Sequence, residues 1–265
     1  MTAAGDRYAT PPTGAPSPVM LHVRVYNPGA DRRVLLLHGL GSDGTTCWRL
    51  AEEVAAAGMT AVVPDLRNHG LSPTTHDHRI VAYASDVALL SDRWDLVVGH
   101  SLGGAVLATL CADPGFAGRA LLLDPVLHLA GPGHDELRAA LASEVGGRLT
   151  HAALATAHPG WPEEDRHRKL LASAMVSRRS TDATMDHNDP WDVIDSIERW
   201  ACPVHLVAAD PEHGALLAPE HVARALARPG VRATTITGAG HSVHRDDPSA
   251  VVALMRDALA AVVAA

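Results

Sequence analysis

The chain has 265 residues, 47% of them hydrophobic, which is enough for one large domain with a substantial core. Its formal net charge is −8 and it has no basic run, which argues against a nucleic-acid or anionic-membrane partner. No apolar stretch reaches the length of a membrane span. The three cysteines lie far apart and are odd in number, as is typical of reduced intracellular proteins, so we expect a cytoplasmic location.

The first 18 residues, MTAAGDRYATPPTGAPSP, lack the basic and apolar regions of a signal peptide. Their proline, glycine and threonine content predicts a loose leader. The rest of the chain shows short apolar runs that alternate with longer alanine-rich stretches. The runs that predict strands are residues 19–26, 32–39, 60–65, 95–100, 119–124, 203–210 and 231–237. The stretches that predict helices are residues 47–58, 79–93, 102–113, 221–228 and 249–263.

Strands that alternate with helices indicate an α/β fold, with a mostly parallel central sheet and helices on both faces. The interval between residues 124 and 203 breaks this alternation, because it contains helical pieces but no convincing strand. It is too long for a bare connection in a compact domain. We therefore expect residues 128–189 to form an inserted helical cap, and residues 1–127 and 190–265 to form the core.

The stretch VVGHSLGGA places Ser101 between Gly99 and Gly103, where a predicted strand turns into a predicted helix. A strained turn of this kind needs small residues beside the serine, because a Cβ would collide with the neighbouring elements. The turn would present the serine hydroxyl at the carboxyl edge of the sheet, where open α/β folds bind ligands. The amide of Leu102 would then lie at a helix N-terminus, where it can donate to an oxyanion.

A second glycine-rich loop follows the strand at residues 32–39, in the stretch LLLHGLGSDG. Gly39 ends this strand, and the amide of the next residue, Leu40, is the most plausible second donor to an oxyanion.

A serine nucleophile needs a base, and with 17 histidines in the chain only position is informative. His241 follows the last predicted strand in GAGHSVHRDDP, in a loop that should emerge at the same sheet edge as Ser101. His244 is the rival, but it lies nearer to the final helix and we expect it at the surface. We expect His100 to support the turn rather than to take part in catalysis.

The histidine in turn needs a carboxylate, and three residues compete for this role. Asp210 ends the predicted strand just before the strand that leads to His241, and it is the preferred candidate. Asp124 ends the strand after the nucleophile helix, and Glu212 lies two residues beyond Asp210. Both remain alternatives.

Five stretches together resemble successive landmarks of the α/β-hydrolase superfamily: LLLHGLGSDG, VVPDLRNHGLS, VVGHSLGGA, LLLDP and GAGHSVHRDDP. The resemblance implies Ser101 as nucleophile, His241 as base, the Leu40 and Leu102 amides as oxyanion hole, a carboxylate after a late strand, and a helical cap. The stretch DLRNHGLS departs slightly from the superfamily pattern, and AADPEHG lacks its usual spacing before the acid. A serine nucleophile disfavours haloalkane dehalogenase and epoxide hydrolase activities, which use aspartate.

These features predict a hydrolase that cleaves a carboxylic ester or a lactone through an acyl-enzyme. The alternatives are a C–C bond hydrolase, a thioesterase or an acyltransferase with the same residues, or a ligand-binding protein with low turnover. We expect Gly39, Trp161 and Trp191 to contact a small-molecule substrate, with Leu127, Leu129 and Met175 nearby, although the tryptophans could instead pack the cap onto the core. No cofactor or metal is expected, because the glycine loops lack nucleotide-binding spacing and no pair of histidines has a metal-ligand context. The sequence predicts no oligomeric state.

Overall fold

A computed structural model describes residues 10–91 and 93–264. The first nine residues of the predicted leader lie outside this part of the chain, and residues 10–18 form no helix or strand. Within the described ranges, no helix combines the length and apolar character needed to cross a bilayer.

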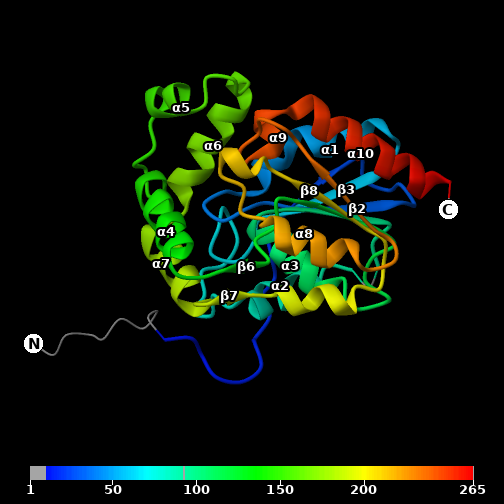
Figure 1. The fold of residues 1–265 in the computed structure, drawn as a ribbon, viewed down its shortest axis with the longest axis horizontal. Helices are drawn as coiled ribbons and strands as arrows, with labels where there is room; N and C mark the ends of the chain where they lie inside the picture. Colours follow the sequence, from blue (N-terminus) through cyan, green and yellow to red (C-terminus); the bar gives the residue numbers. More distant parts are fainter. Residues whose placement is uncertain (1–9, 92, 265) are drawn as a thin grey trace, which may run out of the picture.

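A seven-stranded sheet forms the centre of the molecule, as the alternating pattern predicted (Figure 1). Its strands are, in spatial order, β1 (Val23–Tyr26), β3 (Thr60–Pro64), β2 (Arg33–Leu37), β4 (Leu96–His100), β5 (Ala120–Leu123), β8 (Val204–Ala208) and β9 (Val231–Thr235). The edge strand β1 pairs with β3 in antiparallel register, and every other pairing in this sheet is parallel. The predicted α/β-hydrolase fold, with a mostly parallel sheet, is confirmed.

Helices cover both faces of the sheet (Figure 1). Helices α1 (Trp48–Ala56) and α10 (Pro248–Val263) pack on one face, and α2 (Ile80–Ala88), α3 (Leu102–Leu110) and α8 (Pro219–Leu226) on the other. The side chains of β2 alternate between the two faces of the sheet, so this strand contributes to the hydrophobic core on both faces. Val34 and Leu36 join the core beneath α1 and α10, and Leu35 and Leu37 join the core beneath α2 and α3. A strand covered on both sides is continuously apolar, as β2 is.

A helical insertion separates β5 from β8. Its four helices are α4 (Pro132–Glu144), α5 (His151–Ala157), α6 (Glu163–Met175) and α7 (Arg178–His187), and they lie together beside the sheet (Figure 1). Strands β6 (His128–Leu129) and β7 (Trp191–Asp192) pair in antiparallel register at the two ends of the insertion. The sequence did not predict this two-stranded ribbon, because two residues are too few to show a period.

Short elements complete the chain and shape the loops near the carboxyl edge of the sheet. They are the 3-10 helices η1 (Gly44–Cys47), η2 (Ile194–Arg199) and η3 (Pro211–His213), and the four-residue helix α9 (Val243–Asp246). Helix α9 follows directly on the loop that carries His241.

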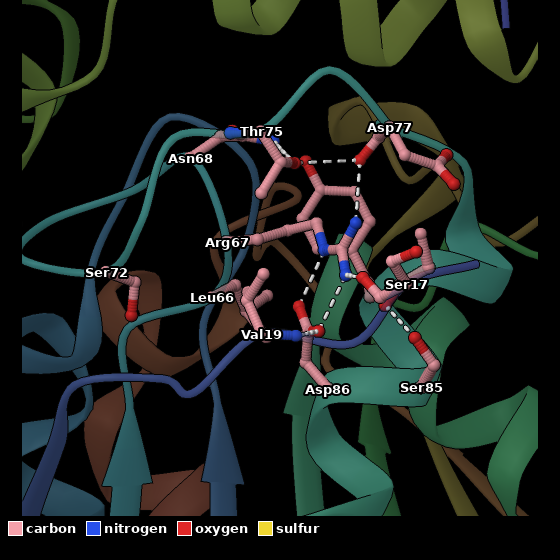
Figure 2. Close-up of polar contacts among 12 residues, drawn as sticks. Ser17, Val19, Leu66, Arg67, Asn68, Ser72, Thr75, Asp77, Ser85 and Asp86 are labelled. Atoms are coloured by element: carbon pink, nitrogen blue, oxygen red, sulfur yellow. Dashed lines mark hydrogen bonds and ion pairs between the residues drawn. The ribbon is translucent and has the colours of Figure 1, made fainter. Parts of the chain in front are cut away.

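The stretch DLRNHGLS is held by a buried ion pair (Figure 2). The Arg67 guanidinium donates from Nε and Nη2 to the two carboxylate oxygens of Asp86 on α2, each at 2.6 Å. Arg67 also donates to the carbonyl oxygens of Asp77 and Ser17, and the Val19 amide donates to Asp86 at 2.6 Å. One arginine thus joins this loop, helix α2 and the segment before β1.

Asn68, where the stretch departs from the superfamily pattern, also shapes this loop. It has a positive φ of 65°, a backbone conformation that asparagine tolerates better than most residues. Its Oδ1 accepts a hydrogen bond from the Thr75 amide at 2.6 Å (Figure 2). These contacts give the DLRNHGLS loop a structural role.

Candidate active site

Ser101 sits on a sharp turn between β4 and α3. Its φ of 54° and ψ of −117° lie in a region that non-glycine residues seldom adopt, so the turn stores strain. A Cβ on Gly99 would lie 2.6 Å from the carbonyl oxygen of Gly103, and one on Gly103 would lie 2.6 Å from the carbonyl oxygen of Leu37. Gly99 is therefore needed for β4 to approach α3 this closely, and Gly103 is needed for α3 to approach the end of β2.

His241 reaches Ser101 from the loop between β9 and α9. Its Nε2 lies 2.9 Å from the Ser101 Oγ. The carbonyl oxygen of His241 accepts a hydrogen bond from the Nε2 of His100 at 2.9 Å. Burial lowers the pKa of His100 well below its usual range, so this ring stays neutral. His100 therefore holds the His241 loop in place and makes no hydrogen bond to the serine among those that the structure describes.

His244 does not lie at the surface, where we expected it. It is buried, and its ring centroid is 4.6 Å from that of His100. Burial lowers its pKa well below the usual range. The expectation failed because three of the four residues of α9 are buried and the His244 ring packs beside that of His100 on β4, a placement that the polar stretch HRDDP does not reveal.

Asp124 is the carboxylate that meets His241. Its Oδ2 lies 2.7 Å from the His241 Nδ1, and the side chain is fully buried. The same carboxylate accepts hydrogen bonds from three backbone amides, those of Ala209 at 3.2 Å, Leu216 at 2.9 Å and Leu217 at 3.3 Å. A continuous hydrogen-bonded chain thus runs from the serine through the imidazole to a fixed carboxylate.

Asp210, the preferred acid in the sequence analysis, makes different contacts. Its Oδ1 accepts from the Glu212 amide at 3.0 Å and its Oδ2 from the Gly238 amide at 2.7 Å. These two backbone hydrogen bonds lower its pKa. The Glu212 side chain is exposed to solvent.

Asp210 does not contact His241 because of the course of the loop after β8. Pro211 starts a 3-10 helix directly after Asp210, and Asp210 becomes its N-cap. The loop then turns back and brings the amides of residues 216 and 217 to Asp124. The sequence analysis preferred Asp210 for its position at the end of a strand, but Asp124 ends the neighbouring parallel strand, so this position alone does not identify the carboxylate that contacts His241.

Two backbone segments approach the serine from either side. A Cβ on Gly39 would lie 2.9 Å from the His100 Nδ1 and 3.1 Å from the Ser101 Cβ, so the loop after β2 comes close to the serine only because Gly39 has none. Leu40, the next residue, lines the adjoining cavity. Leu102 opens α3, where the first N–H groups have no acceptor within the helix.

His38 holds the loop after β2 in position. Its Nε2 accepts a hydrogen bond from the Leu66 amide at 2.9 Å, and its Nδ1 donates to the Gly39 carbonyl at 2.9 Å. Burial lowers its pKa to about 4, so the ring is neutral at pH 7. A neutral imidazole can donate and accept at once, as this position requires.

A cavity of about 930 Å³ opens over Ser101 and His241. Its walls come from the loop after β2, helix α4, the segment after α5, and the loops before α8 and α9. Trp161 and Trp191, which the sequence analysis expected to contact the substrate, both line this cavity. Each also makes a structural hydrogen bond: Trp161 Nε1 donates to Asp246 at 2.6 Å, and Trp191 Nε1 donates to the Val126 carbonyl at 2.8 Å. Leu129 lines the cavity, whereas Leu127 is buried elsewhere and Met175 is 51% exposed.

Within the part of the chain that the structure describes, no group of three or more His, Cys, Asp or Glu side chains is placed to hold an ion.

The fold and this site have the form of an α/β-hydrolase, and comparison with known proteins agrees. The model of the alpha/beta hydrolase family matches residues 34–254, and the chain belongs to this family. It is 30% identical to esterase YbfF of Escherichia coli over 245 residues, which cover 84% of this chain and 91% of the esterase. It is 40% identical to lipase LipV of Mycobacterium tuberculosis over 116 residues, which cover 42% of this chain and 44% of the lipase.

Solved structures share the fold. A thermophilic esterase from Thermogutta terrifontis superposes with a TM-score of 0.68 at 23% identity, over 91% of this chain and 93% of that one. The family membership and the two named relatives together support an enzyme, a hydrolase of the esterase type.

Proposed function

We propose that this chain is a serine hydrolase that cleaves a carboxylic ester or lactone through an acyl-enzyme. The observation that carries the proposal is the hydrogen-bonded chain from the Ser101 Oγ through His241 to Asp124, in the wall of a cavity large enough for a small molecule. The esterase among the relatives supports the same reaction class.

In the proposed mechanism the His241 Nε2 takes the proton of Ser101 as its oxygen attacks the substrate carbonyl. The backbone amides of Leu40 and Leu102 stabilise the tetrahedral oxyanion. His241 then gives the proton to the leaving alcohol, and water releases the acyl group by the reverse sequence. Asp124 keeps the other imidazole proton on Nδ1 and stabilises the imidazolium while it exists.

The helical insertion completes the proposed site. We propose that residues 128–189 act as a cap over the core, because α4 and the segment after α5 supply cavity walls above Ser101. We also propose a cytoplasmic location, because the three cysteines are odd in number and lie far apart in the sequence.

The test is intact-mass labelling with a fluorophosphonate on the native chain and on the Ser101→Ala and His241→Ala variants. We expect one label on the native chain, none on Ser101→Ala and strongly slowed labelling of His241→Ala. A panel of p-nitrophenyl esters, lactones and thioesters then identifies the reaction class. A folded native chain that takes no label would overturn the proposal and favour a ligand-binding protein with this fold.

A further inference from the structure

The active-site cavity contains a buried cation that the proposed mechanism does not use. Arg245 lies on α9, four residues after His241, and lines the cavity. The residue is only 4% exposed. Its guanidinium carbon lies 5.1 Å from the centroid of the Trp161 ring, which also lines the cavity.

Arg245 has very few hydrogen-bond partners for a buried guanidinium. Its Nη1 donates to the Ser242 Oγ at 3.3 Å, and its buried Nε has no acceptor. Among the residues that the structure describes, no carboxylate forms an ion pair with it. Most of the five N–H donors of this guanidinium therefore have no acceptor among the residues that the structure describes.

The nearby carboxylates are each bound to another donor. Asp165, Glu144 and Asp246 are the acids whose charges act on Arg245 from a distance. Their own contacts are Asp165 with Arg49 at 2.6 Å, Glu144 with Lys169 at 2.7 Å and Asp246 with the Trp161 indole at 2.6 Å. Asp165 and Glu144 are thus paired with other cations and Asp246 with a neutral indole, and none of the three lies within ion-pair distance of Arg245.

A buried charge without a counter-ion is costly, and arginine does not escape this cost by losing its proton. Burial lowers the pKa of Arg245, which reflects the loss of water around the guanidinium. The planar fork of a guanidinium matches a carboxylate, to which it donates two parallel hydrogen bonds. A substrate carboxylate in the cavity would supply both the missing charge and the missing acceptors.

We propose that Arg245 binds a carboxylate of the substrate, and that the preferred substrates are therefore esters that also carry a free carboxylate. This inference rests on the proposed ester hydrolysis at Ser101 and specifies its substrate class. Arg245 would bind the end of the substrate that is distant from the reacting carbonyl. Trp161 would cover the apolar part of the substrate between the carboxylate and this carbonyl.

The test compares esters that differ only in this charge. One series contains monomethyl esters of four- to six-carbon dicarboxylic acids, and the other contains O-acetyl esters of hydroxy acids, so that the carboxylate lies on either side of the scissile bond. Each acid is paired with its primary amide, which has nearly the same shape and no charge. The measured quantity is the ratio of kcat/KM for the acid to kcat/KM for the amide, because a general loss of catalysis cancels from it.

We expect the native enzyme to favour the acid by about tenfold or more in at least one series, as a charge-assisted hydrogen-bonded pair allows. Arg245→Gln should bring this ratio close to one. Arg245→Lys should give an intermediate ratio, because it keeps the charge but loses the fork. Arg138→Gln is the control: Arg138 lies on α4, is paired with Asp186 and does not line the cavity, so its loss should leave the ratio unchanged.

Two results would overturn the inference and leave the proposed function intact: a native ratio near one with good turnover of the amides, or an Arg245→Gln ratio equal to the native one. If Arg245→Gln does not fold by circular dichroism, the native ratio and the Arg245→Lys ratio decide the question. No turnover of any ester, together with no fluorophosphonate label, would instead overturn the proposed function and this inference with it.

Discussion

Replacing Asp124 by asparagine tests whether Asp124, and not Asp210, is the carboxylate on which His241 depends. The substitution keeps the shape of the side chain but turns one of its acceptor oxygens into a donor amide. In the structure both oxygens are fully used: Oδ2 faces His241 Nδ1 and the Leu216 amide, and Oδ1 faces the amides of Ala209 and Leu217. Either orientation of the new amide group therefore points a donor at a donor.

The size of the effect follows from these contacts. With its NH₂ in place of Oδ2, the asparagine leaves the Leu216 amide without an acceptor and favours the imidazole tautomer whose Nε2 carries the proton. That tautomer cannot accept the proton of Ser101, so we expect kcat/KM to fall by about 10³- to 10⁴-fold. With its NH₂ in place of Oδ1, two buried amides lose their acceptor, at about 1–3 kcal/mol of folding stability each.

The assay is kcat/KM on a p-nitrophenyl ester, with urea unfolding for stability, and Asp210→Asn is the matched control. Asp210 binds the backbone amides of Glu212 and Gly238 and lies 3.4 Å from the His213 Nδ1, and none of these groups belongs to the Ser101–His241 pair, so its variant should keep most of the activity. The reasoning would be refuted if Asp210→Asn lost as much activity as Asp124→Asn. It would also be refuted if Asp124→Asn stayed within about tenfold of the native rate.

Three further predictions concern the scaffold of the site. Gly103→Ala should cost about 1–3 kcal/mol in urea unfolding, because its Cβ would meet two backbone oxygens of β2 and the residue after it at 2.6 and 2.7 Å; Gly160→Ala, with no atom within 4 Å, should cost little, and equal losses would contradict the packing argument. Asp86→Ala should lower the free energy of unfolding by about 3–5 kcal/mol, because it leaves Arg67 buried and unpaired; a loss typical of a surface ion pair would show that water enters this site. The pKa of His38 is lowered to about 4 from 6.5, so the unfolded chain binds more protons between these values and stability should fall as the pH drops through that range, by about 3 kcal/mol for this group. His38→Gln should flatten this part of the stability curve in urea titrations from pH 7 to pH 4, and an unchanged slope would assign the acid sensitivity to other groups.

Several parts of the fold could be predicted because they depend on local pattern. The apolar runs of β2 and β4 are short, continuous and buried on both faces, as is typical of central strands in a parallel sheet. Glycines flank Ser101 because α3 lies against β4 at Gly99 and against the end of β2 at Gly103, and their spacing is visible in the sequence. The ribbon of β6 and β7 was missed because its hydrogen bonds join residues more than sixty positions apart.

Chain order and local chemistry were thus enough to predict the strands of the sheet, the strained turn at Ser101 and the loop that carries His241, since each lies within one short stretch of sequence. Tertiary structure decided which carboxylate meets that histidine, because Asp124 and Asp210 end neighbouring strands and only the course of the η3 loop selects between them. It likewise decided that His244 is buried and that Arg245 lines the cavity without a counter-ion. The burial of a side chain and the partners that it contacts depend on segments that lie far apart in the sequence. They are decided only when the helical insertion and α9 pack around the same cavity.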